Sequence, residues 1–109
     1  MLPVDPPLTA TELRVVLDQV LTSEGALVYG ARLFEKLARR GVSVLDLLHV
    51  CRHWDVLRST RVEYGQWRYR IEGPNLDGKW MAVVLSVQPD PPRAVAITAF
   101  RFARGRTRP

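Results

Sequence analysis

The sequence has little cysteine, no long apolar run and no export signal, and each absence excludes a class of protein. The single cysteine among 109 residues, Cys51, excludes an internal disulfide and a zinc site built from several cysteines. No apolar run approaches the roughly 20 residues that a membrane-spanning helix needs. The first residues lack the basic and apolar segments of a secretory signal. We therefore expect a cytoplasmic protein with no membrane partner.

Motifs that hold phosphates or metals are also missing. The chain has no glycine-rich phosphate loop and no His-Glu-x-x-His pattern. Its glycines at 65, 73 and 78 fall at the ends of expected strands, where turns need them. Ser43 is explained as the cap of a helix, and nothing in its surroundings suggests a nucleophile. We expect no cofactor and no resident metal.

The charge of the chain is concentrated at one end. The formal net charge is +5, from 16 Lys and Arg against 11 Asp and Glu. Residues 1–92 carry 11 basic and 11 acidic side chains, whereas residues 93–109 carry five arginines and no acid. Such an end either neutralises a few phosphates of a nucleic acid or keeps the protein soluble, and the sequence leaves both readings open.

Three segments carry apolar residues at helical spacing: 9–24, 28–40 and 43–53. Thr9 and Glu12 form a capping box at the start of the first. The inward-facing residues expected for the second and third helices are Ala31, Phe34, Leu37 and Ala38, and Val44, Leu47, Leu48 and Cys51.

From Arg61 onward the apolar period changes from 3.6 residues to two, which predicts strands. In the segment 66–71, three apolar residues alternate with three polar ones. The nearly continuous apolar run 81–87 indicates a central strand that is covered on both faces. A last strand is expected over 94–102, with loops at 74–78 and 88–92.

Helices followed by strands predict an α+β fold. We expect two to three N-terminal helices on one face of an antiparallel, three- to four-stranded meander sheet. The expected domain covers 9–102, after an extended lead-in (1–8) and before a basic, flexible tail (103–109).

The polar face of the predicted sheet is the first candidate site. Its members are Arg61, Glu63, Gln66, Arg68, Arg70, Glu72 and Arg101. Alternate residues of a strand lie about 7 Å apart, so Arg68 and Arg70 are spaced to hold adjacent phosphates of RNA. Bases would stack on Tyr64, Trp67, Tyr69 or Trp80 wherever one of these faces the same groove. In the alternative interpretation, this is an exposed sheet face on which Glu63 and Glu72 pair with arginines across strands.

The third expected helix carries a second candidate site. Asp46, His49 and His53 share the helix face opposite its apolar stripe. They would form a metal site, a solvated polar surface, or a place where one histidine acts as acid or base. Cys51 lies on the apolar stripe, so we expect a small buried hydrophobe there rather than a nucleophile.

Three segments together resemble a known family: LARRGVSVLDLLHV (37–50), LDGKWMAVVLSV (76–87) and AVAITAFR (94–101). They are similar to a small bacterial domain family grouped with RelE-like and BrnT-like toxins, and the resemblance covers about residues 28–102. It implies a RelE-like fold, related to barnase-type nucleases. For many relatives it also implies a metal-independent, mRNA-cleaving ribonuclease toxin that is held by an antitoxin protein.

The resemblance also implies roles for particular residues. Arg68 and Arg70, with Thr98 and Arg101 on the last strand, match the family pattern, and Arg61 joins them as an expected RNA contact. In a ribonuclease, Arg68 and Arg70 would clamp the phosphate, and Glu63 or Glu72 would be the catalytic base.

One feature departs from the family pattern. Many relatives carry His-Ala near the start of the helix before Arg-Gly, where this chain has Tyr29-Gly30-Ala31-Arg32. Two functions therefore stay open. The protein is an RNA-binding ribonuclease toxin, or it is an inactive member of the fold that serves as a binding or protein-interaction module.

Overall fold

The computed structural model describes residues 6–63 and 65–103, apart from the side chains of Ser59 and Glu63. It contains the helices α1 (Ala10–Thr22), α2 (Leu33–Arg40) and α3 (Val44–His53). The strands are β1 (Leu27–Tyr29), β2 (Val56–Glu63), β3 (Gln66–Pro74), β4 (Trp80–Pro89) and β5 (Pro92–Arg101). The expected α+β class is confirmed. Tyr64, the first five residues of the lead-in and residues 104–109 of the tail lie outside the described residues.

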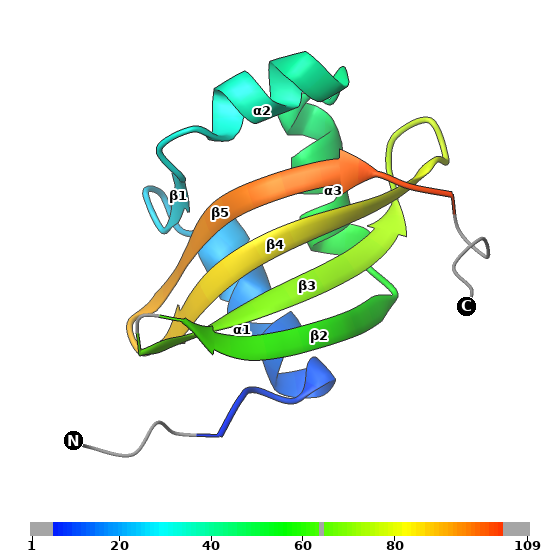
Figure 1. The fold of residues 1–109 in the computed structure, drawn as a ribbon. Coiled ribbons are helices and arrows are strands. Elements are labelled where there is room, and N and C mark those ends of the chain that lie inside the picture. The colour runs from blue at the N-terminus through cyan, green and yellow to red at the C-terminus, as the bar shows by residue number, and fades with distance from the viewer. Residues whose placement is uncertain (1–5, 64, 104–109) are drawn as a thin grey trace.

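Within the described residues, the sheet has five strands in the order β1-β5-β4-β3-β2 (Figure 1). The strands β2 to β5 form the expected antiparallel meander. The expectation of a purely antiparallel sheet with at most four strands is wrong, because β1 pairs with β5 in parallel and makes the sheet mixed. The three residues of β1 are too few for their apolar period to separate a strand from a helix.

The helix expected over 28–40 is shorter than predicted. Val28 and Tyr29 belong to β1, and α2 starts only at Leu33. The N–H of Gly30 donates to the carbonyl of Ala96 at 2.8 Å, which ties the segment to the sheet. Phe34, expected to face inward, is 57% exposed, and Ala31 and Ala38 are exposed as well. Leu37 is buried as expected, and Leu33 is buried although it was not expected to face inward.

The starts of α1 and α3 agree with the sequence signals. Thr9 and Glu12 form the complete capping box of α1, and the hydroxyl of Ser43 accepts the N–H of Asp46 at the start of α3. Gly41 ends α2 with a left-handed φ of 66°, a conformation that glycine adopts without steric cost.

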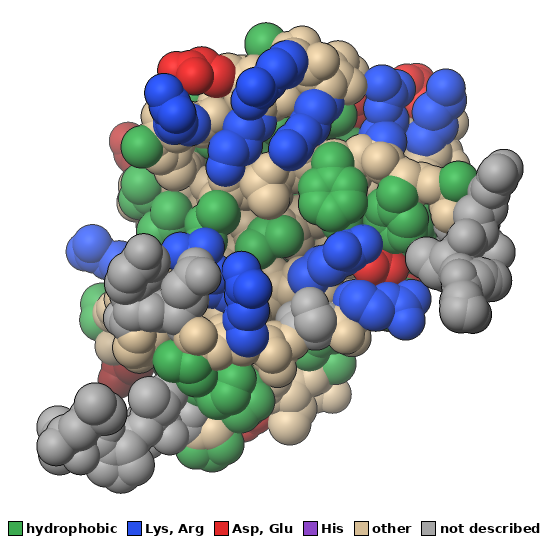
Figure 2. Space-filling view, viewed as in Figure 1, with side chains coloured by type: hydrophobic (Ala, Val, Ile, Leu, Met, Phe, Trp, Pro, Cys, Tyr) green, Lys and Arg blue, Asp and Glu red, His purple; other side chains and the backbone are tan. Residues whose placement is uncertain are grey.

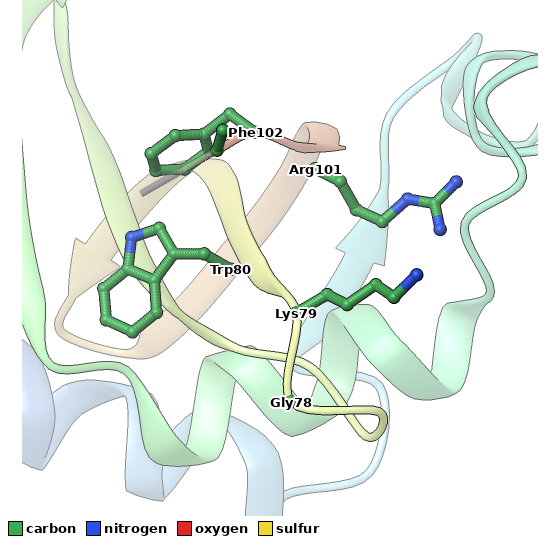
Figure 3. A pocket seen from close by; sticks show the side chains of 6 residues that line it. Gly78, Lys79, Trp80, Arg101 and Phe102 are labelled. Atoms are coloured by element: carbon green, nitrogen blue, oxygen red, sulfur yellow. The ribbon is translucent and has the colours of Figure 1, made fainter. Parts of the chain in front are cut away.

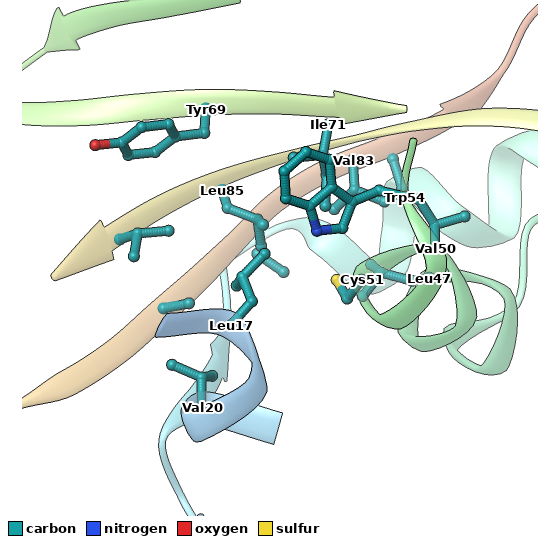
Figure 4. Packing of buried hydrophobic residues seen from close by; sticks show 14 of the residues in the cluster. Leu17, Val20, Leu47, Val50, Cys51, Trp54, Tyr69, Ile71, Val83 and Leu85 are labelled. Carbon is teal, nitrogen blue, oxygen red and sulfur yellow. The ribbon is translucent and has the colours of Figure 1, made fainter. Parts of the chain in front are cut away.

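The core lies between the helices and one face of the sheet. In Figure 1, α1 and α3 lie behind the sheet and α2 lies along the β5 edge. Figure 4 shows Leu17 and Val20 of α1 and Leu47, Val50 and Cys51 of α3 packed with Trp54 against Tyr69, Ile71, Val83 and Leu85. The apolar face predicted for β3 is therefore the surface that receives the helices.

The opposite face of the sheet is called the open face below, and none of the helices in the described residues lies on it (Figure 1). The expectation that β4 is covered on both faces is therefore wrong. Met81, Val83 and Leu85 are buried under the helices, whereas Val84 and Ser86 point the other way and stay part-exposed. A run of apolar residues does not reveal whether a helix or the side chains of neighbouring strands cover the second face.

A close backbone approach joins β3 to the segment after α3. The N–H of Asp55 donates to the carbonyl of Glu72 at 2.8 Å. A Cβ placed on Gly73 would lie 2.9 Å from the Cα of Trp54 and 3.1 Å from the carbonyl oxygen of His53. Only glycine fits this position without moving the backbone.

We predict that Gly73→Ala lowers the free energy of unfolding by about 1–3 kcal/mol, because the added methyl group overpacks a contact made of backbone atoms. Urea denaturation followed by tryptophan fluorescence measures the change. A variant within about 0.5 kcal/mol of the parent protein would contradict the packing described at this position.

Candidate nucleic-acid interface

The open face gathers basic side chains from neighbouring strands. On β3, Arg68, Arg70 and Glu72 alternate with the buried Tyr69 and Ile71, so they point away from the helices. Figure 2 shows Lys and Arg side chains on both sides of a band of hydrophobic side chains on this face, with few acidic ones between them. The alternation in the sequence predicts the basic side chains over the strands, whereas the upper row in Figure 2 lies over α2.

Three arginines line one hollow on the open face. Arg61 on β2 is the register partner of Arg68 on β3. Together with Arg70, Tyr69 and Val84 they surround a shallow hollow of about 230 Å³, called the arginine hollow below. None of the described residues that line it is acidic. Three guanidinium groups around one hollow form a site suited to an anion with several oxygens, such as a phosphodiester.

Glu72 is buried on the open face although no helix covers it. The residue is 1% exposed. Its Oε2 lies 2.9 Å from Nε of Arg70, and its Oε1 lies 3.5 Å from Nη2 of Arg58 on β2. The carboxylate therefore pairs with arginines within and across strands, as in the alternative interpretation above. Its burial and its two partners do not favour the role of catalytic base. The side chain of Glu63, the other candidate base, lies outside the described part of the structure.

Two phenylalanine rings also contact Arg70. The guanidinium carbon lies 5.1 Å from the ring centroid of Phe100 and 5.3 Å from that of Phe102. Arg70 is thus fixed by one carboxylate and two aromatic rings. Sequence reasoning did not select Arg58, Phe100 or Phe102. The spacing of the two phenylalanines could have identified them, because residues 98, 100 and 102 of a strand lie on the same face.

Thr98 lies on the open face, but it is already engaged. Its hydroxyl accepts a hydrogen bond of 2.6 Å from Nη1 of Arg40, which also donates to the carbonyl of Ala99 at 3.1 Å. One turn earlier on α2, Nζ of Lys36 lies 3.5 Å from the carbonyl oxygen of Ile97. The side chains of Lys36 and Arg40 thus bond to residues 97–99 of β5, which follow the part of the strand that pairs with β1. They therefore cover an edge of the sheet that would otherwise be exposed.

Arg101 does not join the arginine hollow, so the expectation that it shares a face with Arg68 and Arg70 is wrong. Its register partner is Met81, which faces the helices. Its Nη2 donates to the carbonyl of Arg40 at 3.2 Å, at the end of α2. Arg101 follows Thr98 by three positions, an odd number, so the two side chains lie on opposite faces of the sheet.

The residues of the second candidate site are brought together only in part. The rings of His49 and His53 lie 4.6 Å apart. Asp46 serves another purpose, because Oδ2 accepts from the hydroxyl of Ser43 at 3.0 Å and Oδ1 from the N–H of Leu76 at 3.1 Å. Among residues 6–63 and 65–103, no three His, Cys, Asp or Glu side chains cluster as metal ligands would.

Cys51 is buried under Trp54 and the sheet (Figure 4). This burial raises the pKa of the thiol to about 12. The thiolate, which is the nucleophilic form, is therefore nearly absent at neutral pH. Cys51 is the buried hydrophobe that was expected.

The aromatic residues proposed for base stacking divide between the two faces. Tyr69 is buried on the helix face, where its hydroxyl accepts the N–H of Leu8 at 2.9 Å. Trp67 packs against the core from the same face. Trp80 shares the open face with Glu72, because it stands two residues before Ala82, the register partner of Glu72.

No family model, curated protein or solved structure matches this chain. Function is therefore inferred from the arrangement of the described side chains. Within that part of the chain, no helix has the length and apolar character needed to cross a membrane.

We predict that Arg70→Ala destabilises the protein more than Arg58→Ala does. Arg70 is 33% exposed and makes the shorter contact with Glu72, so its loss leaves a buried carboxylate poorly paired and costs about 1–3 kcal/mol. Arg58 is 61% exposed, and its loss should cost less than about 1 kcal/mol. Urea denaturation of both variants makes the comparison, and equal losses would contradict the role given to Arg70.

Proposed function

We propose that this protein binds single-stranded RNA through the open face of its sheet, as a RelE-like RNA-binding protein. The observation that carries the proposal is the arginine hollow, where Arg61, Arg68 and Arg70 come together from two strands. Guanidinium groups bind phosphate oxygens in pairs of parallel hydrogen bonds. The net charge of +5 adds attraction at long range.

Arg70 is prepared for this role before any ligand arrives. Glu72 and the rings of Phe100 and Phe102 hold its side chain in place. An arginine that is already ordered loses less conformational entropy when it binds, so more of the contact energy remains as affinity. The exposed guanidinium edge is then the part that meets a phosphate.

Of the two functions left open by the sequence, the arrangement favours binding without cleavage. Attack by a 2′-hydroxyl needs a base within hydrogen-bond reach of it. Glu72 is buried and paired with two arginines, so it is poorly placed to take that proton. We therefore propose a cytoplasmic binding module. An antitoxin-like partner would compete with RNA for the open face.

Fluorescence anisotropy with a labelled uridine 12-mer at 50 and 200 mM salt tests the proposal. Each of the substitutions Arg61→Ala and Arg68→Ala should weaken binding at 50 mM salt by roughly tenfold (about 1.4 kcal/mol). Each should also reduce the slope of log affinity against log salt by about 0.7, the value for one phosphate contact with a single strand.

Arg52→Ala is the matched control. Arg52 is an exposed arginine on α3, which lies behind the sheet (Figure 1), so its loss removes the same charge from the other side of the molecule. Equal weakening by Arg52→Ala and Arg68→Ala would reduce the effect to net charge and overturn the proposed interface. RNA that is cut by the parent protein in EDTA, but not by Arg68→Ala, would instead establish a ribonuclease.

A further inference from the structure

A second hollow lies at the other end of the central strands and has no role in the function proposed above. It measures about 690 Å³ and is called the C-terminal hollow below. It is lined by Gly78, Lys79, Trp80, Arg101, Phe102 and Ala103. Two of these residues are aromatic, two are cationic and none is acidic.

The two kinds of side chain are separated in space. Figure 3 shows the rings of Trp80 and Phe102 together on one side of the strand ends, while Lys79 and Arg101 extend side by side in the other direction. The N–H of Phe102 donates to the carbonyl of Trp80 at 3.1 Å, which continues the β4–β5 pairing past the end of β5. The backbones that carry the two rings are therefore paired.

The aromatic side of this hollow is continuous with the open face. Phe102 contacts Arg70, which also lines the arginine hollow. A path therefore runs from the three arginines across Arg70 to the aromatic pair and then to the two cations. Arg101 donates one hydrogen bond to the carbonyl of Arg40, and this bond holds its guanidinium group at the rim of the C-terminal hollow.

We infer that the C-terminal hollow is a nucleotide subsite for single-stranded RNA. One unpaired base stacks on Trp80 and Phe102, and a neighbouring phosphate is bound by Lys79 and Arg101. The inference rests on the proposed function and adds the direction of the RNA path. Aromatic rings give affinity for a base of any sequence, because every base has a π-face, whereas cations act on the phosphate alone.

Two substitutions separate these contributions in binding to an adenosine 12-mer. Trp80→Leu removes the ring but keeps an apolar side chain. It should weaken binding by roughly 5- to 150-fold, the range for one lost base–aromatic stack, and leave the salt slope unchanged. Lys79→Ala should do the opposite, with a modest loss of affinity and a slope lower by about 0.7.

The matched controls are Trp80→Phe and Arg93→Ala. Trp80→Phe keeps a stacking ring, so binding should stay within about threefold of the parent protein. Arg93 is exposed near the opposite end of β5, so its removal should not change the salt slope. Far-UV circular dichroism and urea denaturation establish that each variant is folded before its affinity is compared.

The outcomes separate this inference from the proposed function. If Trp80→Leu and Lys79→Ala bind the 12-mer as the parent does while Arg68→Ala is weakened, the subsite is overturned and the arginine hollow stands. If Trp80→Leu weakens binding but Arg61→Ala and Arg68→Ala do not, the subsite is supported and the arginine hollow is overturned. A parent protein that binds neither 12-mer at 50 mM salt overturns both.

Discussion

The packing of helices against only one face of the sheet is the constraint on which the rest of this structure depends. Trp54 and the apolar stripes of α1 and α3 cover Tyr69, Ile71 and Leu85 (Figure 4). The other face of the same strands has no helix, so the sheet must close it with its own side chains. Glu72 reaches 1% exposure in this way, which puts a carboxylate out of water and makes its arginine partners necessary.

The buried carboxylate determines how the nearby arginines of the open face are arranged. Arg70 neutralises Glu72 and lies against Phe100 and Phe102, while Arg58 approaches the carboxylate from β2 at a longer distance. One group of interactions therefore stabilises the sheet and fixes a guanidinium beside the arginine hollow. Stability and binding are coupled at Arg70, whereas Arg61 and Arg68 can be changed without removing a partner of Glu72.

Local patterns predicted much of the fold. The capping residues Thr9 and Ser43 and the alternation over 66–71 each depend on neighbours within a few residues, and the structure agrees with them. The β1 strand was missed because its pairing with β5 involves a partner nearly 70 residues away. Nothing in the sequence near Leu27 reveals such a partner.

The candidate site was predicted less completely, for the same reason. Alternation placed Arg68 and Arg70 on one face. It did not show that Glu72 is buried on that face, because its partner Arg58 comes from β2, and Arg70 is held against Phe100 from β5. Arg101 was assigned by its charge, although its position three residues after Thr98 places it on the opposite side. Charge and residue type indicate chemistry, whereas the register between strands decides which residues meet.

The central claim is that RNA meets the open face and not the helices. Backbone amide chemical shifts in a ¹⁵N-labelled sample, titrated with the uridine 12-mer, test it most directly. We expect the perturbed amides to lie in β3 around 68–72, in β4 around 84–86, and at 79–80 and 101–103. Perturbations confined to α1 and α3, or an unchanged spectrum at saturating RNA, would contradict the claim.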